Sequence, residues 1–291
     1  MNSFYRNKKT VEGLVEFQVV SWYDTDNADG VYQVFLFGVM EDGSSVCVKV
    51  NGVRPHFYVL IPDQYQKVWS STMTAEVERQ VNHRIKDSNT TVAVYEQTHK
   101  KLFPYTAEKP FRFLKLLFSS YGAMKTALKM FNYDLYINRL KIYFTVYEAN
   151  IDTILRFSHI QEILPAGWVR VEEYKQAENS RCQVDIEANF SKVKGIIKEN
   201  ETNAPLVVAS FDIECMSYDA YSKNKSIFPD ATKPKDTVSQ IGTTFWNFKS
   251  GETLKVLLTL GECDTIQDTI VETFKTEKAL IERWVDLIGR I

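Results

Sequence analysis

Two carboxylates one residue apart, Asp212 and Glu214, are the side chains of this sequence with the clearest potential for chemistry. They end a largely apolar run, residues 205–211, which predicts a strand. Side chains alternate along a strand, so the two acids share one face while Phe211 and Ile213 point into packing. Mg²⁺ or Mn²⁺ would relieve the repulsion between like charges on one face. The spacing predicts half of a metal-dependent nuclease site, and the alternative is a strand that ends in solvent with two exposed acids.

The elements that must position this pair make up a second domain, residues 205–291. Strands are expected at 206–214, 236–248 and 254–260, with an irregular stretch at 216–235. Thr276 can cap a final helix whose apolar residues keep a 3.6 period, namely Leu280, Ile281, Trp284, Leu287, Ile288 and Ile291. Three strands followed by a helix is how an RNase H-like nuclease begins.

The first domain is expected to cover residues 1–204. A β-rich unit at about 14–61 shows alternating strands, and Asp42 and Gly43 stand where a hairpin turn belongs. A strand–helix–strand unit at about 90–170 suggests a ferredoxin-like or RNA-recognition-like fold. The polar residues 173–204 read as a connector between the domains. The fold class is therefore mixed α+β and α/β.

Composition indicates a folded chain without membrane spans. Its 291 residues are 44% hydrophobic, enough for real cores. No apolar window reaches about 18 residues and the N-terminus lacks the apolar segment of a signal peptide, so we expect an intracellular protein. The four cysteines lack C-x-x-C spacing, which argues against zinc and, inside a cell, against disulfides; they are Cys47, Cys182, Cys215 and Cys263.

Charge is unevenly distributed along the chain. Residues 1–150 hold 18 basic and 15 acidic residues, whereas 151–291 hold 17 and 22. The segment from Lys100 to Lys141 has nine basic residues against two acids and many aromatic rings. Cations with aromatics suit a single-stranded nucleic acid, although core packing explains most of the rings. The candidate nucleic-acid-binding residues are Lys100, Lys101, Lys109, Arg112 and Lys115.

Several separate stretches, in one order along the chain, resemble the family B DNA polymerases, particularly the eukaryotic delta type and those of large DNA viruses. His56 stands where the family has an aromatic residue, and residues 62–95 have no clear counterpart. The matching stretches are NGVRPHFYV at 51–59, FRFLKLLFSS at 111–120, YEANI at 147–151, LRF at 155–157, GW at 167–168, SFDIEC at 210–215, FP at 228–229, D-x-V-x-Q-I at 236–241, TE at 276–277 and Trp284.

The resemblance implies the N-terminal portion of a replicative DNA-directed DNA polymerase with a 3′–5′ proofreading exonuclease. SFDIEC is similar to the first exonuclease motif, so Asp212 and Glu214 would be catalytic ligands of Mg²⁺ or Mn²⁺, held weakly here because further carboxylates would lie beyond residue 291. Implied partners are primer–template and single-stranded DNA, dNTPs, the remainder of the polymerase chain and a sliding clamp. The implied location is a eukaryotic nucleus or a viral replication site.

Two other functions remain open. A stand-alone RNase H-like nuclease would need further acids. A non-catalytic module that binds single-stranded nucleic acid would show affinity that does not depend on metal.

Overall fold

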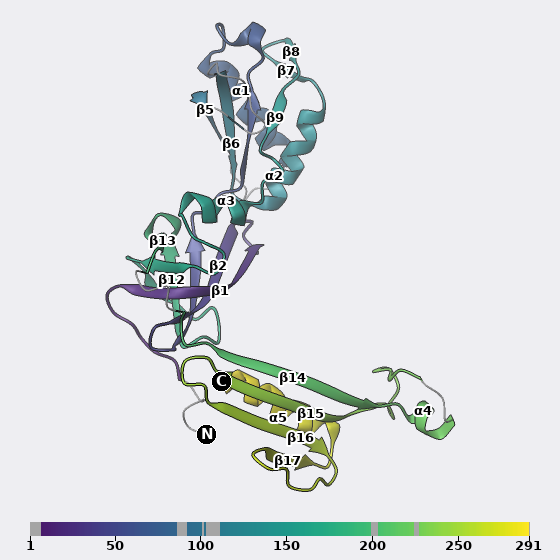
Figure 1. The fold of residues 1–291 in the computed structure, drawn as a ribbon. Coiled ribbons are helices and arrows are strands. Elements are labelled where there is room, and N and C mark those ends of the chain that lie inside the picture. Colours follow the sequence, from purple (N-terminus) through teal and green to yellow (C-terminus); the bar gives the residue numbers. More distant parts are fainter. Residues whose placement is uncertain are drawn as a thin grey trace.

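Three β-sheets, each with its own core, make up most of the protein (Figure 1). The structure is a computed structural model. It describes residues 7–85, 92–100, 102, 111–198, 203–223 and 227–290. One sheet has seven strands, two have four, and a two-stranded hairpin is added to one of the latter. Among the described residues, no helix is both long enough and apolar enough to cross a membrane.

The seven-stranded sheet has the order β11-β12-β3-β2-β1-β10-β13. The expected alternation is clear in β2, where Tyr32, Val34 and Leu36 are buried and the residues between them are not. Gly43 has φ 84°, which confirms the hairpin turn between β2 and β3. The strands are β1 (Val15–Asp26), β2 (Tyr32–Met40), β3 (Ser45–Asn51), β10 (Trp168–Val171), β11 (Lys175–Gln176), β12 (Val184–Asn189) and β13 (Val193–Ile196).

The prediction of a connector at 173–204 is wrong, because β11, β12 and β13 belong to this sheet. β12 pairs in parallel with β3, with Val184 opposite Val46, and β13 pairs with β10. Val184 and Ile186 are fully buried. The sequence pattern does not predict this strand, because it is short, polar residues flank it and its partner strand lies far away in the sequence.

The second sheet has the order β5-β6-β4-β9. Two helices pack on it, and the order along the chain is strand, helix, strand, strand, helix, strand. Met73, Val77 and Val81 of α1 and Ala123, Met124 and Ala127 of α2 enter its core. The elements are β4 (His56–Leu60), α1 (Ser71–Ile85), β5 (Val92–Lys100), β6 (Phe111–Phe118), α2 (Tyr121–Leu128) and β9 (Thr145–Tyr147).

The predicted unit at 14–61 therefore divides after β3. β4 pairs with β6 and β9 instead of joining β1 to β3. Its residues His56 to Val59 are all buried, as in a central strand, whereas a strand with one open face would alternate. Pro55 directly precedes the strand, as expected of a residue without an N–H group. Likewise, β10 at the end of the predicted unit 90–170 lies in the seven-stranded sheet.

The third sheet has the order β14-β15-β16-β17, with α5 against it. β14, β15 and β16 are antiparallel, and β17, which the sequence did not reveal, runs parallel to β16. The Thr276 hydroxyl accepts a hydrogen bond from the Ala279 N–H, which confirms the expected cap. The elements are β14 (Val207–Met216), α4 (Tyr218–Lys223), β15 (Thr237–Asn247), β16 (Thr253–Leu260), β17 (Ile270–Phe274) and α5 (Glu277–Arg290).

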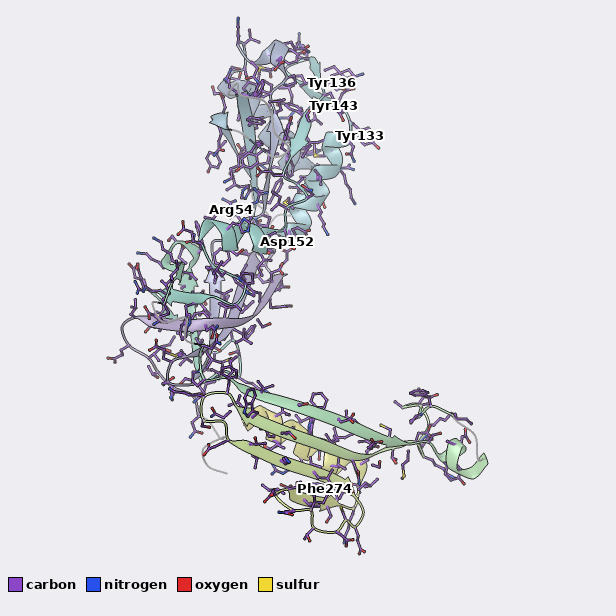
Figure 2. All side chains as sticks on the ribbon, viewed as in Figure 1. Arg54, Tyr133, Tyr136, Tyr143, Asp152 and Phe274 are labelled. Atoms are coloured by element: carbon purple, nitrogen blue, oxygen red, sulfur yellow. The ribbon has the colours of Figure 1, made fainter. Side chains whose placement is uncertain are left out.

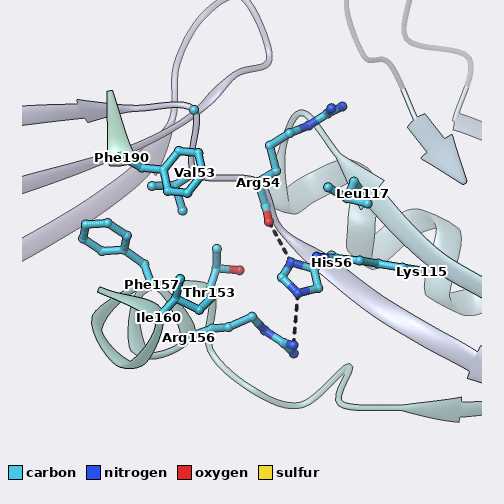
Figure 3. A pocket seen from close by; sticks show the side chains of 11 residues that line it. Val53, Arg54, His56, Lys115, Leu117, Thr153, Arg156, Phe157, Ile160 and Phe190 are labelled. Atoms are coloured by element: carbon cyan, nitrogen blue, oxygen red, sulfur yellow. Dashed lines mark hydrogen bonds between the residues drawn. The ribbon is translucent and has the colours of Figure 1, made fainter. Parts of the chain in front are cut away.

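A partly buried ionic network joins the first two sheets at α3 (Thr153–Ile160). The Arg156 guanidinium donates to the Glu148 carboxylate at 2.7 Å and to Nε2 of His56 at 3.1 Å. An arginine only donates, so Nε2 accepts and the Nδ1–H of His56 donates to the Arg54 carbonyl (Figure 3). Arg54, His56 and Arg156 line a cavity of about 220 Å³. Phe157 of α3 meanwhile packs into the seven-stranded sheet's core.

Removing this guanidinium should destabilise the fold. Arg156→Met leaves Glu148, whose side chain is 14% exposed, without its cation, at an expected cost of about 3 kcal/mol. Chemical denaturation measures the free energy of unfolding. The control is Arg79→Met, which breaks the surface pair with Glu76 and should cost much less, because solvent screens that pair. Equal costs would contradict a role for the network in joining the sheets.

Candidate functional site

Asp212 and Glu214 lie side by side on β14, the edge strand of the third sheet. Antiparallel pairing sets Asp212 opposite Gly242 and Glu214 opposite Gln240 of β15. Phe211 contacts Trp284 of α5, with ring centroids 4.9 Å apart, so alternation places both acids on the sheet face away from α5. Both are exposed. The two carboxylates therefore share an open face, as the spacing predicted.

The backbone around the pair leaves room beside it. A Cβ added to Gly242 would meet no atom within 4 Å, so the space next to Asp212 is open. The Ile213 N–H donates to Oδ1 of Asp212 at 3.0 Å. The Ser239 hydroxyl donates to the Glu214 carbonyl at 3.0 Å and ties β14 to the start of β15. These bonds fix the strand while the acid face stays accessible.

The donor set fits a hard divalent cation in part. Exposed carboxylate oxygens are ligands that Mg²⁺ and Mn²⁺ accept, but these ions take about six oxygens. Within the described residues, no group of three or more His, Cys, Asp or Glu side chains could hold a metal ion. Two carboxylates with open space around them thus fit a cation that keeps most of its water.

Phe211 and Ile213 are not core residues, which corrects the prediction. Phe211 is 50% exposed and Ile213 is 42% exposed. Among the described strands, β14 pairs with β15 alone, so one of its edges is unpaired. The core under α5 is formed instead by β15 and β16, through Ile241, Phe245, Val256 and Leu258 with Leu280 and Leu287 of the helix.

Asp236 organises the irregular stretch after β14, a structural role that sequence reasoning missed. Its Oδ1 accepts the Tyr218 N–H and its Oδ2 accepts the Asp230 N–H, both at 2.9 Å. The Lys235 ammonium lies 4.1 Å from the Tyr218 ring centroid. A buried Asp directly before a strand, following a polar loop, is the signal that could have identified this anchor.

The described candidate nucleic-acid-binding residues lie on β5 and β6 and have different surroundings. Arg112 is used within the fold, since its guanidinium donates to the Glu96 carboxylate at 2.6 Å and to the Gln66 and Trp69 carbonyls. Lys115 lines the cavity near α3, 5.9 Å from the Tyr58 ring. Lys100 ends β5, and Lys101 and Lys109 lie outside the described residues. Binding of nucleic acid by this set stays a prediction.

The region that holds the acid pair matches a known family. Residues 144–291 match the model described as DNA polymerase family B, exonuclease domain. This match covers about half of the chain and includes β14 and the whole third sheet. The chain therefore belongs to the family B DNA polymerases, by their exonuclease domain, and the resemblance of its motifs is confirmed.

Individual proteins similar to this chain are DNA polymerases, in agreement with the family match. A DNA polymerase of Pyramimonas orientalis virus is 30% identical, over 80% of this chain and 20% of that protein. The DNA polymerase of Acanthamoeba polyphaga mimivirus is 29% identical, over 95% of this chain and 17% of that protein. The DNA polymerase delta catalytic subunit of Arabidopsis thaliana is 29% identical, over 87% and 23%. The chain spans about a fifth of the length of these curated relatives.

A solved structure has the same fold. The family B DNA polymerase from the hyperthermophilic archaeon Pyrobaculum calidifontis aligns with a TM-score of 0.58, over 94% of this chain and 29% of that chain. Sequence identity is 19%, so this likeness speaks for the fold alone. It confirms the expected mixed α and β architecture.

Metal binding should depend on the acid pair. Asp212→Asn combined with Glu214→Gln should weaken Mn²⁺ binding at least about tenfold, because it removes both charged ligands. Titration of free Mn²⁺ followed by electron paramagnetic resonance measures this affinity. Glu262→Gln with Asp264→Asn, an exposed pair of equal spacing in the same domain, is the matched control. A similar loss in both double variants would show that the Mn²⁺ is held nonspecifically.

The two phenylalanines of the third sheet should differ in their contribution to stability. Phe211→Ala should cost about 1 kcal/mol, since half of the ring is already in water. Phe245→Ala removes a fully buried ring and should cost about 3–5 kcal/mol. Urea unfolding of the two variants makes the comparison. A larger loss for Phe211→Ala would mean that β14 is covered in solution.

Proposed function

We propose that these residues are part of a replicative DNA-directed DNA polymerase of family B with 3′–5′ proofreading activity. The observation that carries the proposal is the exposed Asp212–Glu214 pair, with open space opposite Asp212, within the region matched to the exonuclease family. The names of the viral and delta-type relatives support DNA synthesis as the activity of the whole protein.

Asp212 and Glu214 act as ligands in this proposal. A Mg²⁺ or Mn²⁺ ion held there would supply an activated water and would stabilise the leaving 3′ oxygen of the DNA strand. β14 presents both carboxylates from one rigid strand, which fixes their spacing. The space over Gly242 is where the 3′ end would enter. The described residues add no third ligand to this pair, so further carboxylates would have to complete the site.

The remaining assignments follow from the family. We propose residues 1–204 as the N-terminal domain and 205–291 as the start of an RNase H-like exonuclease domain. The strand and helix order of the second sheet supports a ferredoxin-like or RNA-recognition-like unit. Primer–template and single-stranded DNA and dNTPs are the substrates. The rest of the polymerase chain and a sliding clamp are the partners, in a eukaryotic nucleus or a viral replication site.

Residues 1–291 alone should not digest DNA. Incubation with Mg²⁺ or Mn²⁺ and a 5′-labelled single strand should leave the strand intact, because two carboxylates cannot complete a two-metal site. Sustained shortening from the 3′ end that disappears in Asp212→Ala would establish a stand-alone nuclease instead. An antibody against this chain should also detect a protein several times larger than 33.7 kDa in its source cells.

The full-length protein separates the two activities. Asp212→Ala with Glu214→Ala should abolish removal of mismatched 3′ ends, because both ligands are lost. It should leave primer extension intact, because synthesis uses another domain in this proposal. Gel assays of 3′ trimming and of primer extension measure both, with Glu262→Gln and Asp264→Asn as the control. Unchanged trimming in the Asp212 and Glu214 variant would refute the assignment.

A further inference from the structure

Three tyrosines share one exposed surface at the end of the molecule farthest from β14 (Figure 2). Tyr133 is 72%, Tyr136 62% and Tyr143 59% exposed. Phe131, the other aromatic residue of 131–143, is buried. The surface thus consists of the aromatic residues of 131–143 that the core does not use.

The hairpin of β7 (Leu135–Ile137) and β8 (Leu140–Ile142) arranges these rings. Its inward face is formed by Leu135, Ile137 and Ile142, which belong to the core of the second sheet. On the outward face Tyr136 stands directly opposite Lys141. Tyr143, two residues after Lys141, continues that face. The order on the face is therefore Tyr136, Lys141 and Tyr143, with neighbouring side chains roughly 5–8 Å apart.

The hairpin tip adds a further cation in an unusual backbone conformation. Asn138 and Arg139 have φ of 48° and 69°, as in the two-residue turn where Asn-Gly is preferred. Residues 129–143 contain three basic side chains, Lys129, Arg139 and Lys141, and one acid, Asp134, a balance of +2. Asp134 lies 3.2 Å from the Lys141 ammonium.

The hairpin is held firmly. The Gln80 side chain of α1 donates to the Tyr136 carbonyl at 2.7 Å, which fixes β7 at its centre. The buried face of the hairpin contributes side chains to a core with α1 and α2. Binding to a surface that is already ordered costs little conformational entropy.

We propose that Tyr133, Tyr136 and Tyr143, with Arg139 and Lys141, bind single-stranded DNA by stacking of its bases. Flat rings accept any base and the neighbouring cations accept phosphates, which matches the chemistry of a single strand. Leu140 is the exposed aliphatic side chain of the hairpin, so rings and cations make up most of this surface. This site is separate from the acid pair. Given the proposed function, in which the acid pair takes the 3′ end, the tyrosine site holds another segment of the DNA.

Fluorescence anisotropy with labelled oligo-dT of about 16 nucleotides tests the proposal on residues 1–291 at low salt. Replacing all three tyrosines by Leu should weaken binding on the order of tenfold or more. Replacing all three by Phe keeps the rings and should retain the affinity. Tyr23→Leu, another exposed tyrosine on β1, is the control and should bind as the parent does. Arg139→Ser should weaken binding and lower its salt dependence.

The proposal fails if the parent does not bind oligo-dT, or if the Leu and Phe variants bind equally well. It also fails if a duplex of the same length binds as tightly as the single strand and loses as much affinity in the Leu variant. Circular dichroism melting checks the fold, and the single variants Tyr133→Leu and Tyr143→Leu, which lie outside the strands, decide the test if the triple variant does not fold. Mn²⁺ titration of the same variants should be unchanged, so failure here is distinguishable from failure of the acid site.

Discussion

A guanidinium that is partly removed from water needs acceptors for its donors, and this requirement at Arg156 links the first two sheets. Arg156 lies on α3, whose Phe157 packs against the seven-stranded sheet, while Glu148 and His56 belong to the second sheet's segment of the chain. The same bonds determine the tautomer of His56 at the start of β4. This side chain thus links two sheets that have separate cores, together with the Asp26 carboxylate of β1, which accepts the Tyr121 and Gly122 N–H groups of α2.

The charges of the acid pair are accommodated by exposure to water, in contrast to the paired charge of Arg156. Asp212 and Glu214 are tolerated without a neutralising partner because β14 is an edge strand whose acid face is in water, where repulsion between like charges is small. Burial would have demanded such a partner. The exposed pair and the exposed tyrosines lie at opposite ends of the molecule (Figures 1 and 2), so the two surfaces can work independently.

Local patterns predicted the strands and the acid pair well, and long-range pairing poorly. The alternation in β2 and the shared face of Asp212 and Glu214 follow from a period of two, which neighbouring residues determine. The sheet to which β4 or β12 belongs does not follow from neighbouring residues. It depends on distant partners, such as Leu116 for Phe57 and Val46 for Val184. The apolar strand around Phe211 predicts a core residue because it resembles a central strand, and the sequence does not say which strand is at an edge.

The parallel pair of β3 and β12 has a consequence for the order of folding. Val46 meets Val184, so the seven-stranded sheet cannot close until the segment between them has been made. That segment contains the whole second sheet with α1 and α2, which can assemble from its own contacts. During synthesis on the ribosome we therefore expect the inserted unit to fold first. Its folding would bring the two halves of the larger sheet together and shorten the loop that the non-local pairing must close.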